Sequence, residues 1–192
     1  MVQKRVLIMS LFMYSSVNGS PEDLLNHELK TTAMVNKHSV SLDTVQSMCK
    51  KLYEQAMHET EDPFEPELII GLCRGGLVPL CFLAGDGMFN NRQVRTISIA
   101  SYNDQGSQGQ LSLVVPWGAE DVAYVKKFKS ILIVDDLVDS GATISFVKNM
   151  VQKHAPEAII KTAALFYKPS SQVKPDYYVE ETNDWIIFPW EV

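Results

Sequence analysis

The stretch that decides the fold is Ile131-Leu132-Ile133-Val134-Asp135-Asp136-Leu137-Val138-Asp139-Ser140-Gly141-Ala142-Thr143. It opens with a continuous apolar run, 131–134, which is typical of a strand covered on both faces in a parallel sheet. We expect this strand to end at Asp135-Asp136, and a helix to follow over 144–154. In open parallel sheets, ligands bind beyond the carboxyl ends of the strands. The acidic, glycine-containing turn between strand and helix is therefore the first candidate for a ligand site.

Two kinds of polar group follow this strand, and they suit different parts of a ligand. The loop 139–143 and the start of the next helix offer clustered N–H groups and the Ser140 and Thr143 hydroxyls, which suit a phosphate group. Asp135 and Asp136 would repel a phosphate, so we expect them to face ribose hydroxyls or a hydrated cation. The alternative is a strand end with solvated aspartates and Ser140 as a helix cap. Three carboxylates directly after a fully apolar strand disfavour that alternative.

Strands and helices alternate on both sides of this stretch. Ser41 is a candidate N-cap for an amphipathic helix that ends near residue 57. Further strands are predicted at 68–72, 94–100, 111–115 and 158–166, and an apolar helical segment at 77–83. The alternation indicates an α/β fold with a mainly parallel central sheet flanked by helices.

The composition limits the class of protein. A chain of 192 residues with 46% hydrophobic and 21% charged residues suits one globular domain, or one domain with a small appendage. The net charge of -6 argues against a protein that binds nucleic acid by neutralising phosphates. No apolar stretch approaches the ~20 residues that a membrane-spanning helix needs. Three cysteines make a disulfide framework improbable and favour a reducing, cytoplasmic location.

The N-terminal segment allows two interpretations. Lys4 and Arg5 precede an apolar run, 6–14, and the small residues Ser15 and Ser16, an order that loosely imitates a secretory signal. The run is also rich in Val, Leu, Ile, Phe and Tyr, as in an N-terminal β-strand. The cysteine usage favours the strand.

A second candidate for anion binding is Leu72-Cys73-Arg74-Gly75-Gly76. Glycine lets the backbone approach a ligand closely, and the Arg74 guanidinium supplies several donors for phosphate oxygens. The stretch lacks the lysine and hydroxyl of a nucleotide-binding P-loop, and its glycines are not spaced as in the dinucleotide fingerprint. A nucleophilic role for Cys73 is a further alternative, but no partner histidine lies in a recognisable arrangement.

The stretch 131–143 resembles the signature with which type I phosphoribosyltransferases bind 5-phosphoribosyl-1-pyrophosphate (PRPP). The resemblance implies that Asp135 and Asp136 hold the ribose 2′- and 3′-hydroxyls, directly or through Mg²⁺. It implies that Asp139 exchanges a proton with purine N7. It also implies a loop around the 5′-phosphate, formed by Asp139, Ser140, Gly141, Ala142 and Thr143.

Two other segments resemble parts of the same family. The residues Cys73, Arg74 and Gly75 would form its pyrophosphate loop. Ser101 and Tyr102 would lead into the mobile loop that closes over PRPP, although an ordinary solvated loop remains the alternative. No Lys or Arg occurs between residues 103 and 125, so Arg74 and Mg²⁺ would carry more of the leaving group's charge.

The C-terminal third resembles the xanthine-guanine and hypoxanthine phosphoribosyltransferases. The resemblance implies that Lys168 donates to the exocyclic O6, that Trp185 stacks on the purine and that the Ile186 backbone lies near the 2-position. Core packing is the alternative for Trp185, and still more for Trp190. The apolar Ile187 is a faint hint toward guanine or hypoxanthine rather than xanthine.

The resemblance as a whole implies a type I phosphoribosyltransferase fold over 37–192, with a small hood formed by terminal segments. Residues 1–36 would be an extension of unclear role. The implied function is Mg²⁺-dependent transfer of phosphoribosyl from PRPP to a 6-oxopurine, by a protein that forms a homodimer or homotetramer. Two rivals are a PRPP- or nucleotide-sensing regulator without catalysis, and a phosphoribosyltransferase for another base. The set Asp139, Lys168 and Trp185 argues against the sensor, because a sensor needs no group that acts on the base.

Overall fold

The computed structural model describes residues 36–58, 63–85, 87–102 and 110–191. The chain divides into two units between Asn36 and Lys37, and the fold described here is that of the second unit. The N-terminal strand that the sequence predicts over 6–14 lies outside the described residues. The elements in chain order are β1 (Lys37–Ser39), α3 (Leu42–His58), β2 (Leu68–Cys73), α4 (Leu77–Leu83), β3 (Gln93–Tyr102), β4 (Gln110–Leu113), α5 (Ala119–Val125), β5 (Ser130–Val138), α6 (Ala142–His154), β6 (Ile159–Tyr167), β7 (Tyr177–Glu181) and β8 (Trp185–Ile187).

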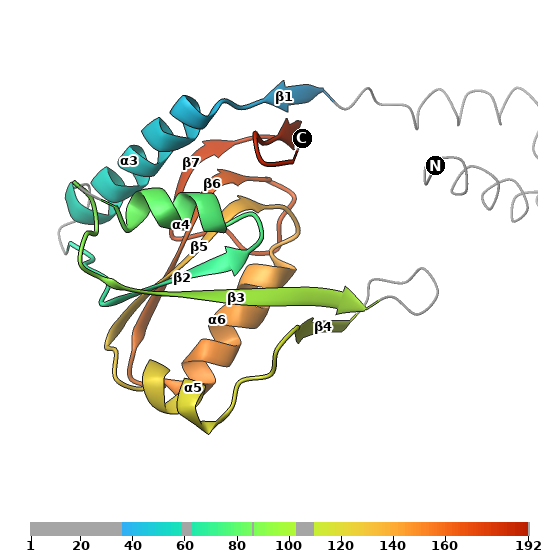
Figure 1. The fold of residues 1–192 in the computed structure, drawn as a ribbon. Coiled ribbons are helices and arrows are strands. Elements are labelled where there is room, and N and C mark those ends of the chain that lie inside the picture. Colours follow the sequence, from blue (N-terminus) through green and yellow to red (C-terminus); the bar gives the residue numbers. More distant parts are fainter. Residues whose placement is uncertain (1–35, 59–62, 86, 103–109, 192) are drawn as a thin grey trace, which may run out of the picture. The chain divides into compact units, whose positions relative to one another are not determined.

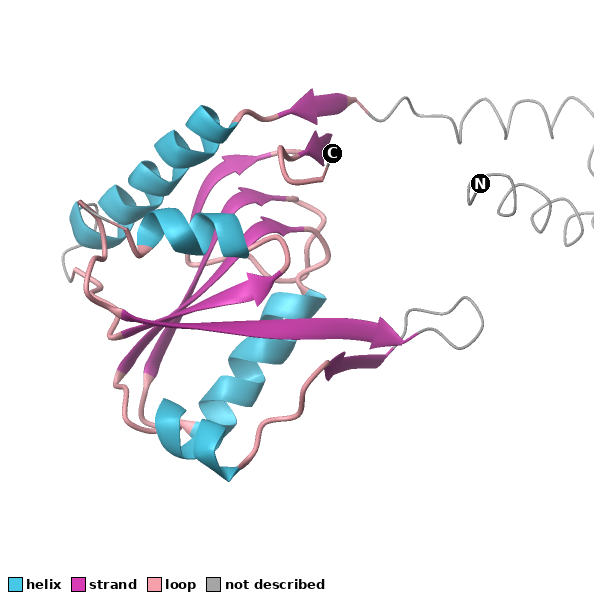
Figure 2. Ribbon diagram, viewed as in Figure 1, coloured by secondary structure: helices cyan, strands magenta, loops and turns pink. Residues whose placement is uncertain are grey.

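A six-stranded sheet in the order β4-β3-β2-β5-β6-β7 forms the centre of the unit (Figure 1). All neighbouring strands run parallel except β4, which pairs antiparallel with β3 at the edge. Helices α3 and α4 cover one face, and α5 and α6 lie on the other (Figure 2). The expected α/β architecture with a mainly parallel sheet is confirmed.

Each face of the sheet carries its own hydrophobic core. Successive residues of a strand point to opposite faces. Ile69 of β2 and Leu132 of β5 therefore pack with the residues of α3 and α4, whereas Ile70 and Ile131 pack with those of α6. All four side chains are buried. Because both faces are covered, these strands appear in the sequence as continuous apolar runs rather than alternating ones.

The predicted elements of the described part are present, with small shifts at their ends. Ser41 is the N-cap of α3, since its Oγ accepts a hydrogen bond from the Thr44 N–H at 3.1 Å. One prediction was wrong: β5 does not end at the acidic pair but continues to Val138, which still pairs with Tyr167 of β6. The strand continues because β6 supplies a partner along its whole length. Asp135 and Asp136 thus lie within β5 and do not mark its end.

The terminal segments of this unit form a second, smaller sheet. In it β1 and β8 pair in parallel, with Lys37 opposite Trp185 and Ser39 opposite Ile187. His38 of β1 packs edge-on against Phe166 near the end of β6, with 6.0 Å between the ring centroids. The small sheet, the expected hood, therefore lies at the carboxyl edge of the large one.

Sequence reasoning missed the strands β1, β7 and β8 and the helix α5. This helix has only seven residues and begins where the Asp121 carboxylate accepts a hydrogen bond from the Gly118 N–H at 2.8 Å. Arg95 of β3 pairs with Asp121 and lies over the ring of Trp117, which fixes the helix to the sheet. Among the described helices, none combines the length and the apolar character that a bilayer crossing requires.

Candidate functional site

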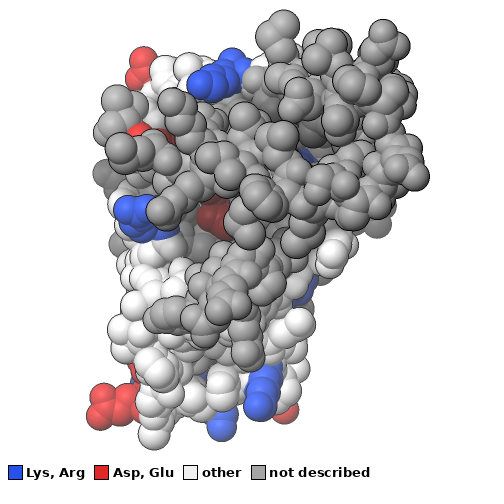
Figure 3. Space-filling view, turned by 90° about the vertical axis from the view of Figure 1, so that its right-hand side faces the viewer, with Lys and Arg blue, Asp and Glu red and all other residues white. Residues whose placement is uncertain are grey.

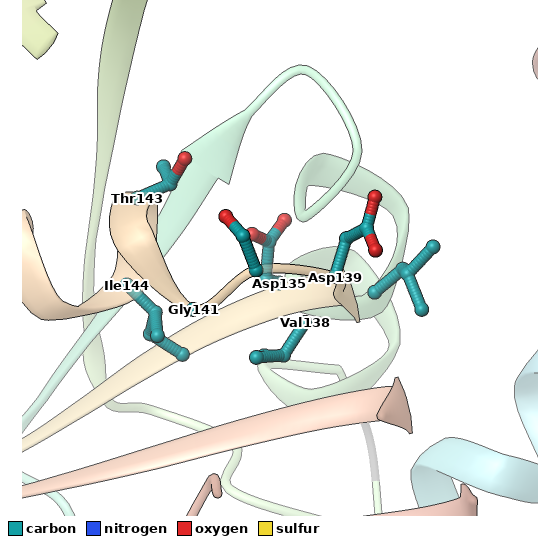
Figure 4. Close-up of a pocket in the computed structure, with 8 residues that line it drawn as sticks. Asp135, Val138, Asp139, Gly141, Thr143 and Ile144 are labelled. Atoms are coloured by element: carbon teal, nitrogen blue, oxygen red, sulfur yellow. The ribbon is translucent and has the colours of Figure 1, made fainter. Parts of the chain in front are cut away.

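The candidate site lies at the carboxyl edge of the parallel strands, around the turn from β5 into α6. A pocket of about 80 Å³ opens there. Its lining residues are Asp135, Leu137, Val138, Asp139, Ser140, Gly141, Thr143 and Ile144. The polar ends of Asp135, Asp139 and Thr143 point to one side of the turn, and Val138 and Ile144 point to the other (Figure 4). Figure 3 views the unit from the side to which these strands point, and acidic atoms are visible there.

Asp135 and Asp136 are adjacent, recessed carboxylates near the end of β5. Burial raises the pKa of Asp135 well above its ordinary value, and the charge of Asp136 raises it further. Burial also raises the pKa of Asp136, although the Leu137 N–H, which donates to Asp136 Oδ1 at 2.8 Å, opposes that shift. The negative charge of Glu191 adds to the increase. In the part of the chain that the structure describes, neither aspartate forms an ion pair. A cationic or hydrogen-bond-donating ligand would remove this electrostatic penalty.

The donor set at this position fits Mg²⁺. This ion takes hard oxygen ligands and is usually held by one or two carboxylates, with water and substrate oxygens completing its shell. Asp135 and Asp136 are two such carboxylates, and Glu191 lies close enough to influence Asp136. Nowhere among the described residues do three His, Cys, Asp or Glu side chains form a complete metal centre. Waters and substrate oxygens would complete the shell of a Mg²⁺ ion held by these two carboxylates.

The glycine turn after β2 packs directly against the acidic pair. A Cβ atom added to Gly75 would lie 2.3 Å from the carboxylate of Asp136, and one added to Gly76 would lie 2.4 Å from the Val134 carbonyl oxygen. Only glycine fits at such separations. The Cys73–Arg74 peptide bond of this turn is cis, and the Arg74 side chain is exposed. The structure thus joins two motifs that lie about sixty residues apart in the sequence.

The turn from β5 into α6 has the backbone of an anion-binding loop. Gly141 is the N-cap of α6 and has a φ of 81°, a left-handed conformation that favours glycine. The first N–H groups of a helix have no partner within it, and the helix dipole makes this end attractive to anions. The Ser140 hydroxyl lies 3.4 Å from one of these groups, the Ala142 N–H.

Asp139 and Lys168 come together although they lie on different strand ends. Lys168 Nζ is 3.3 Å from Asp139 Oδ1, and the lysine side chain is 18% exposed whereas that of the aspartate is 66% exposed. The Lys168 N–H donates to the Val138 carbonyl at 2.9 Å, which continues the β5–β6 pairing beyond Tyr167. A lysine whose side chain is mostly buried and an aspartate whose side chain is exposed therefore lie side by side next to the pocket.

The hood strand β8 pairs with β1 along one of its two edges. The Val40 N–H donates to the Ile187 carbonyl at 3.0 Å, so the polar backbone groups of Ile187 face β1. Because these groups alternate in direction along a strand, those of Ile186 face the opposite edge. Trp185 is 58% exposed, which contradicts simple core packing for this residue. Trp190 instead stacks on Phe188 with 4.7 Å between ring centroids and packs against the core.

The predicted site residues are only partly gathered in one place. The pocket contains Asp135, Asp139, Ser140, Gly141 and Thr143, whereas Trp185 and Ile186 lie on β8, outside its lining. The side chains of Ser101 and Tyr102 and the loop 103–109 lie outside the described residues.

Two contributions to the site were missed at the sequence level. Glu191 acts on Asp136 across the fold, and only its position after an aromatic run marks it in the sequence. Ser171 and Gln172 pack on the loop that contains Gly141. No pattern in the sequence points to these two residues.

Comparison with known proteins supports the same assignment. Residues 32–192 match the phosphoribosyl transferase domain family. A xanthine-guanine phosphoribosyltransferase of Cereibacter sphaeroides is 36% identical over 126 residues, which are 65% of this chain and 68% of that protein. The protein of the same name from Gluconobacter oxydans is 31% identical over 144 residues, 73% of this chain and 77% of its own length.

Solved structures share the fold. A purine phosphoribosyltransferase from Pyrococcus horikoshii superposes with a TM-score of 0.66 at 30% identity, covering 81% of this chain and 95% of that one. The Helicobacter pylori xanthine-guanine-hypoxanthine phosphoribosyltransferase gives 0.69 at 29% identity, covering 82% and 95%. An acidic pair, a glycine turn and an anion-binding loop thus meet at one sheet edge in a chain that belongs to the phosphoribosyl transferase domain family.

Proposed function

We propose that the protein is a purine salvage phosphoribosyltransferase that transfers the phosphoribosyl group of PRPP to guanine, xanthine or hypoxanthine and releases pyrophosphate. One observation carries the proposal. The recessed Asp135–Asp136 pair lies against the turn at Gly75 and lines the same edge as the loop at Gly141. A sugar with a phosphate at one end and a pyrophosphate at the other matches this order of groups. The purine is supported by the names of the relatives in Cereibacter and Gluconobacter.

Each part of PRPP has a partner in this arrangement. Asp135 and Asp136 hold the ribose hydroxyls, either by accepting hydrogen bonds from them or through a bound Mg²⁺ ion. The N–H groups of 139–143 donate to the 5′-phosphate, and Arg74 donates to the pyrophosphate. As the bond from ribose C1 to pyrophosphate breaks, positive charge builds on the sugar and negative charge on the leaving group. Arg74 stabilises the second of these charges.

Asp139 and Lys168 act on the purine. The ion pair between them places a cationic donor beside an anionic acceptor, 3.3 Å apart. A 6-oxopurine offers the complementary pair, since O6 accepts a hydrogen bond and a protonated N7 donates one. Lys168 would donate to O6, while Asp139 takes the N7 proton as general base. Adenine carries an amino donor at position 6 and would face the lysine with the wrong group.

We also propose Mg²⁺ as the cofactor, held by Asp135 and Asp136. Bound there, it supplies positive charge to the ribose hydroxyls and the leaving pyrophosphate. All three cysteines are free, which suits a cytoplasmic enzyme. We further propose that the protein forms a homodimer or a homotetramer, and sedimentation equilibrium would measure this oligomeric state.

Two linked measurements test the proposed function. Calorimetry should show that PRPP binds in the presence of Mg²⁺ and binds more weakly after chelation. Pyrophosphate release from PRPP and guanine should then require both the metal and the base. PRPP binding without turnover on any base would favour a PRPP sensor over an enzyme. If the protein neither bound PRPP nor released pyrophosphate, the proposed activity would be rejected.

A further inference from the structure

The segment that follows β6 lies along the outer side of the phosphate loop. This segment, 168–173, is called the strap below. The Lys168 N–H donates to the Val138 carbonyl at 2.9 Å, and the Gln172 N–H donates to the Ser140 carbonyl at 3.1 Å. The strap therefore holds two carbonyl groups, that of Val138 at the end of β5 and that of Ser140 in the loop.

These two bonds determine where the N–H groups of the loop point. In a planar trans peptide, the C=O and the N–H point in opposite directions. With the Val138 carbonyl turned to the strap, the Asp139 N–H points away from it. The Ser140 carbonyl has the same effect on the Gly141 N–H. The strap thus orients two donors toward the side where the proposed function places a phosphate.

The strap also packs so closely against the loop that it leaves no room for a side chain at Gly141. A Cβ atom added to Gly141 would lie 2.7 Å from Ser171 Oγ and 3.0 Å from the Val173 nitrogen. The Ser171 hydroxyl is itself fixed, since it donates to the Val173 carbonyl at 2.8 Å and lies 3.3 Å from the Val173 N–H. Ser171 therefore closes the turn against which Gly141 packs.

At its first residue the strap carries the lysine that pairs with Asp139. The Ser171 N–H donates to the Lys168 carbonyl at 2.9 Å, so the closed turn and the lysine are parts of one hydrogen-bonded unit. A displacement of the turn would move the phosphate donors and the lysine together.

We infer that Ser171 is a positioning residue, and that the strap couples the phosphate loop to Lys168 so that phosphate binding and base binding support each other. The inference rests on the proposed function, because it takes the loop as the phosphate site and Lys168 as a contact of the base. The Ser171 side chain contacts Val173 and lies beside Gly141, so the proposal gives it an indirect role rather than a contact with either ligand.

The test compares Ser171→Ala with Ser170→Ala, an exposed serine in the same segment, and with Ser171→Thr, which keeps the hydroxyl. Ribose 5-phosphate is the probe of the phosphate loop, and its dissociation constant is measured by calorimetry. We expect a roughly 3- to 10-fold weaker affinity in Ser171→Ala, the size of one or two lost net hydrogen bonds. The KM values for PRPP and for guanine should rise by similar factors while kcat at saturation changes less than about twofold. The Ser170→Ala protein should match the wild type, and Ser171→Thr should restore most of the affinity.

A second measurement uses the unmodified protein. Ribose 5-phosphate should slow amide hydrogen exchange at Lys168 and Gln172, whose N–H groups bind the loop. Unchanged exchange at both positions, or wild-type ribose 5-phosphate affinity in a folded Ser171→Ala protein, would overturn the inference. If the wild type itself fails to bind ribose 5-phosphate and to turn over PRPP, the proposed function fails instead, so the two failures are distinguishable.

Discussion

At the scale of single residues, the candidate site contains groups whose placement lowers the stability of the ligand-free protein. Burial raises the pKa of both Asp135 and Asp136, and the charge of Asp136 raises that of Asp135 further. A raised carboxyl pKa means that the ionised form is disfavoured in the folded protein. Gly75 and Gly141 likewise give up side-chain packing where a neighbouring group leaves no room for a Cβ atom. The recessed carboxyl groups and the two glycines are features expected of a site that binds a ligand.

Asp136→Asn should weaken PRPP binding and stabilise the ligand-free protein. The substitution removes one recessed charge and keeps an oxygen that can accept the hydrogen bond from the Leu137 N–H. We expect an increase of roughly 2–4 °C in melting temperature for about 1 kcal/mol of relief, together with a PRPP affinity at least about tenfold lower. Scanning calorimetry and titration with PRPP and Mg²⁺ give the two values. An unchanged PRPP affinity would contradict the assignment of Asp136.

Asp139→Asn should lower turnover while PRPP still binds. The amide keeps the size of the side chain but cannot take the purine proton, and general acid–base help contributes about 10²–10⁴-fold. Single-turnover kinetics with guanine measures the loss, and calorimetry measures PRPP affinity in parallel. Turnover equal to that of the wild type would remove Asp139 from the mechanism.

Gly75→Ala should raise the KM for PRPP. The new Cβ atom would overlap the Asp136 carboxylate at 2.3 Å, so the turn and the acidic pair must move apart. We expect an increase of about tenfold, the equivalent of about 1.4 kcal/mol. Gly118→Ala is the matched control, because its nearest neighbour would be 3.9 Å away at Asp121 Oδ2. Equal KM values for the two variants would show that the contact at Gly75 is irrelevant to the site.

At the scale of elements, side chains from neighbouring segments hold the edge of the sheet in place. Asp176, just before β7, accepts hydrogen bonds from the Thr162 N–H and hydroxyl at 2.8 Å each. It also pairs with Lys148 of α6 and Lys161 of β6. Burial alone would raise the pKa of Asp176, but the Thr162 hydrogen bonds and the two lysines outweigh burial and lower it. One carboxylate thus ties β7 to two other elements.

A lowered carboxyl pKa fixes the sign of the pH dependence. The stabilisation by Asp176 is present above the ordinary aspartate pKa of about 3.9 and is lost as the pH falls through the lower folded-state value. Asp176→Asn should therefore reduce the free energy of unfolding at pH 7 by about 1.5–3 kcal/mol, the value of hydrogen bonds to a charged group. The difference between variant and wild type should shrink in urea titrations at progressively lower pH, toward pH 3. A difference that stays constant with pH would show that the charge of Asp176 contributes nothing.

How much of each element the sequence revealed depended on its length and its contacts. The apolar runs of β2, β5 and β6 and the Ser41 cap were predictable, because burial on both faces and local capping leave clear patterns. The end of β5 was not, since pairing with Tyr167 prevails over the local preference of two aspartates. The short strands β1 and β8 pair with each other, although they lie near opposite ends of the sequence of this unit. No local pattern can reveal such a pairing.

At the scale of the molecule, the site is assembled from segments that are distant in sequence. The glycine turn follows β2, the acidic pair lies near the end of β5 with the loop 139–143 after it, Lys168 follows β6, and Trp185 lies on β8. The sequence indicated each motif by itself, and the resemblance to a family supplied their roles. The contact of Gly75 with Asp136, the Asp139–Lys168 pair and the strap required the fold.

The most direct test of the central claim is a competition experiment with product analysis. The purified protein is incubated with PRPP, Mg²⁺ and an equimolar mixture of guanine, hypoxanthine, xanthine, adenine and uracil, and the nucleotides formed are separated by chromatography. We predict that 5′-monophosphates of one or more 6-oxopurines appear and that those of adenine and uracil do not. Formation of an adenine or uracil nucleotide instead, or of no nucleotide at all while PRPP binds, would contradict the account.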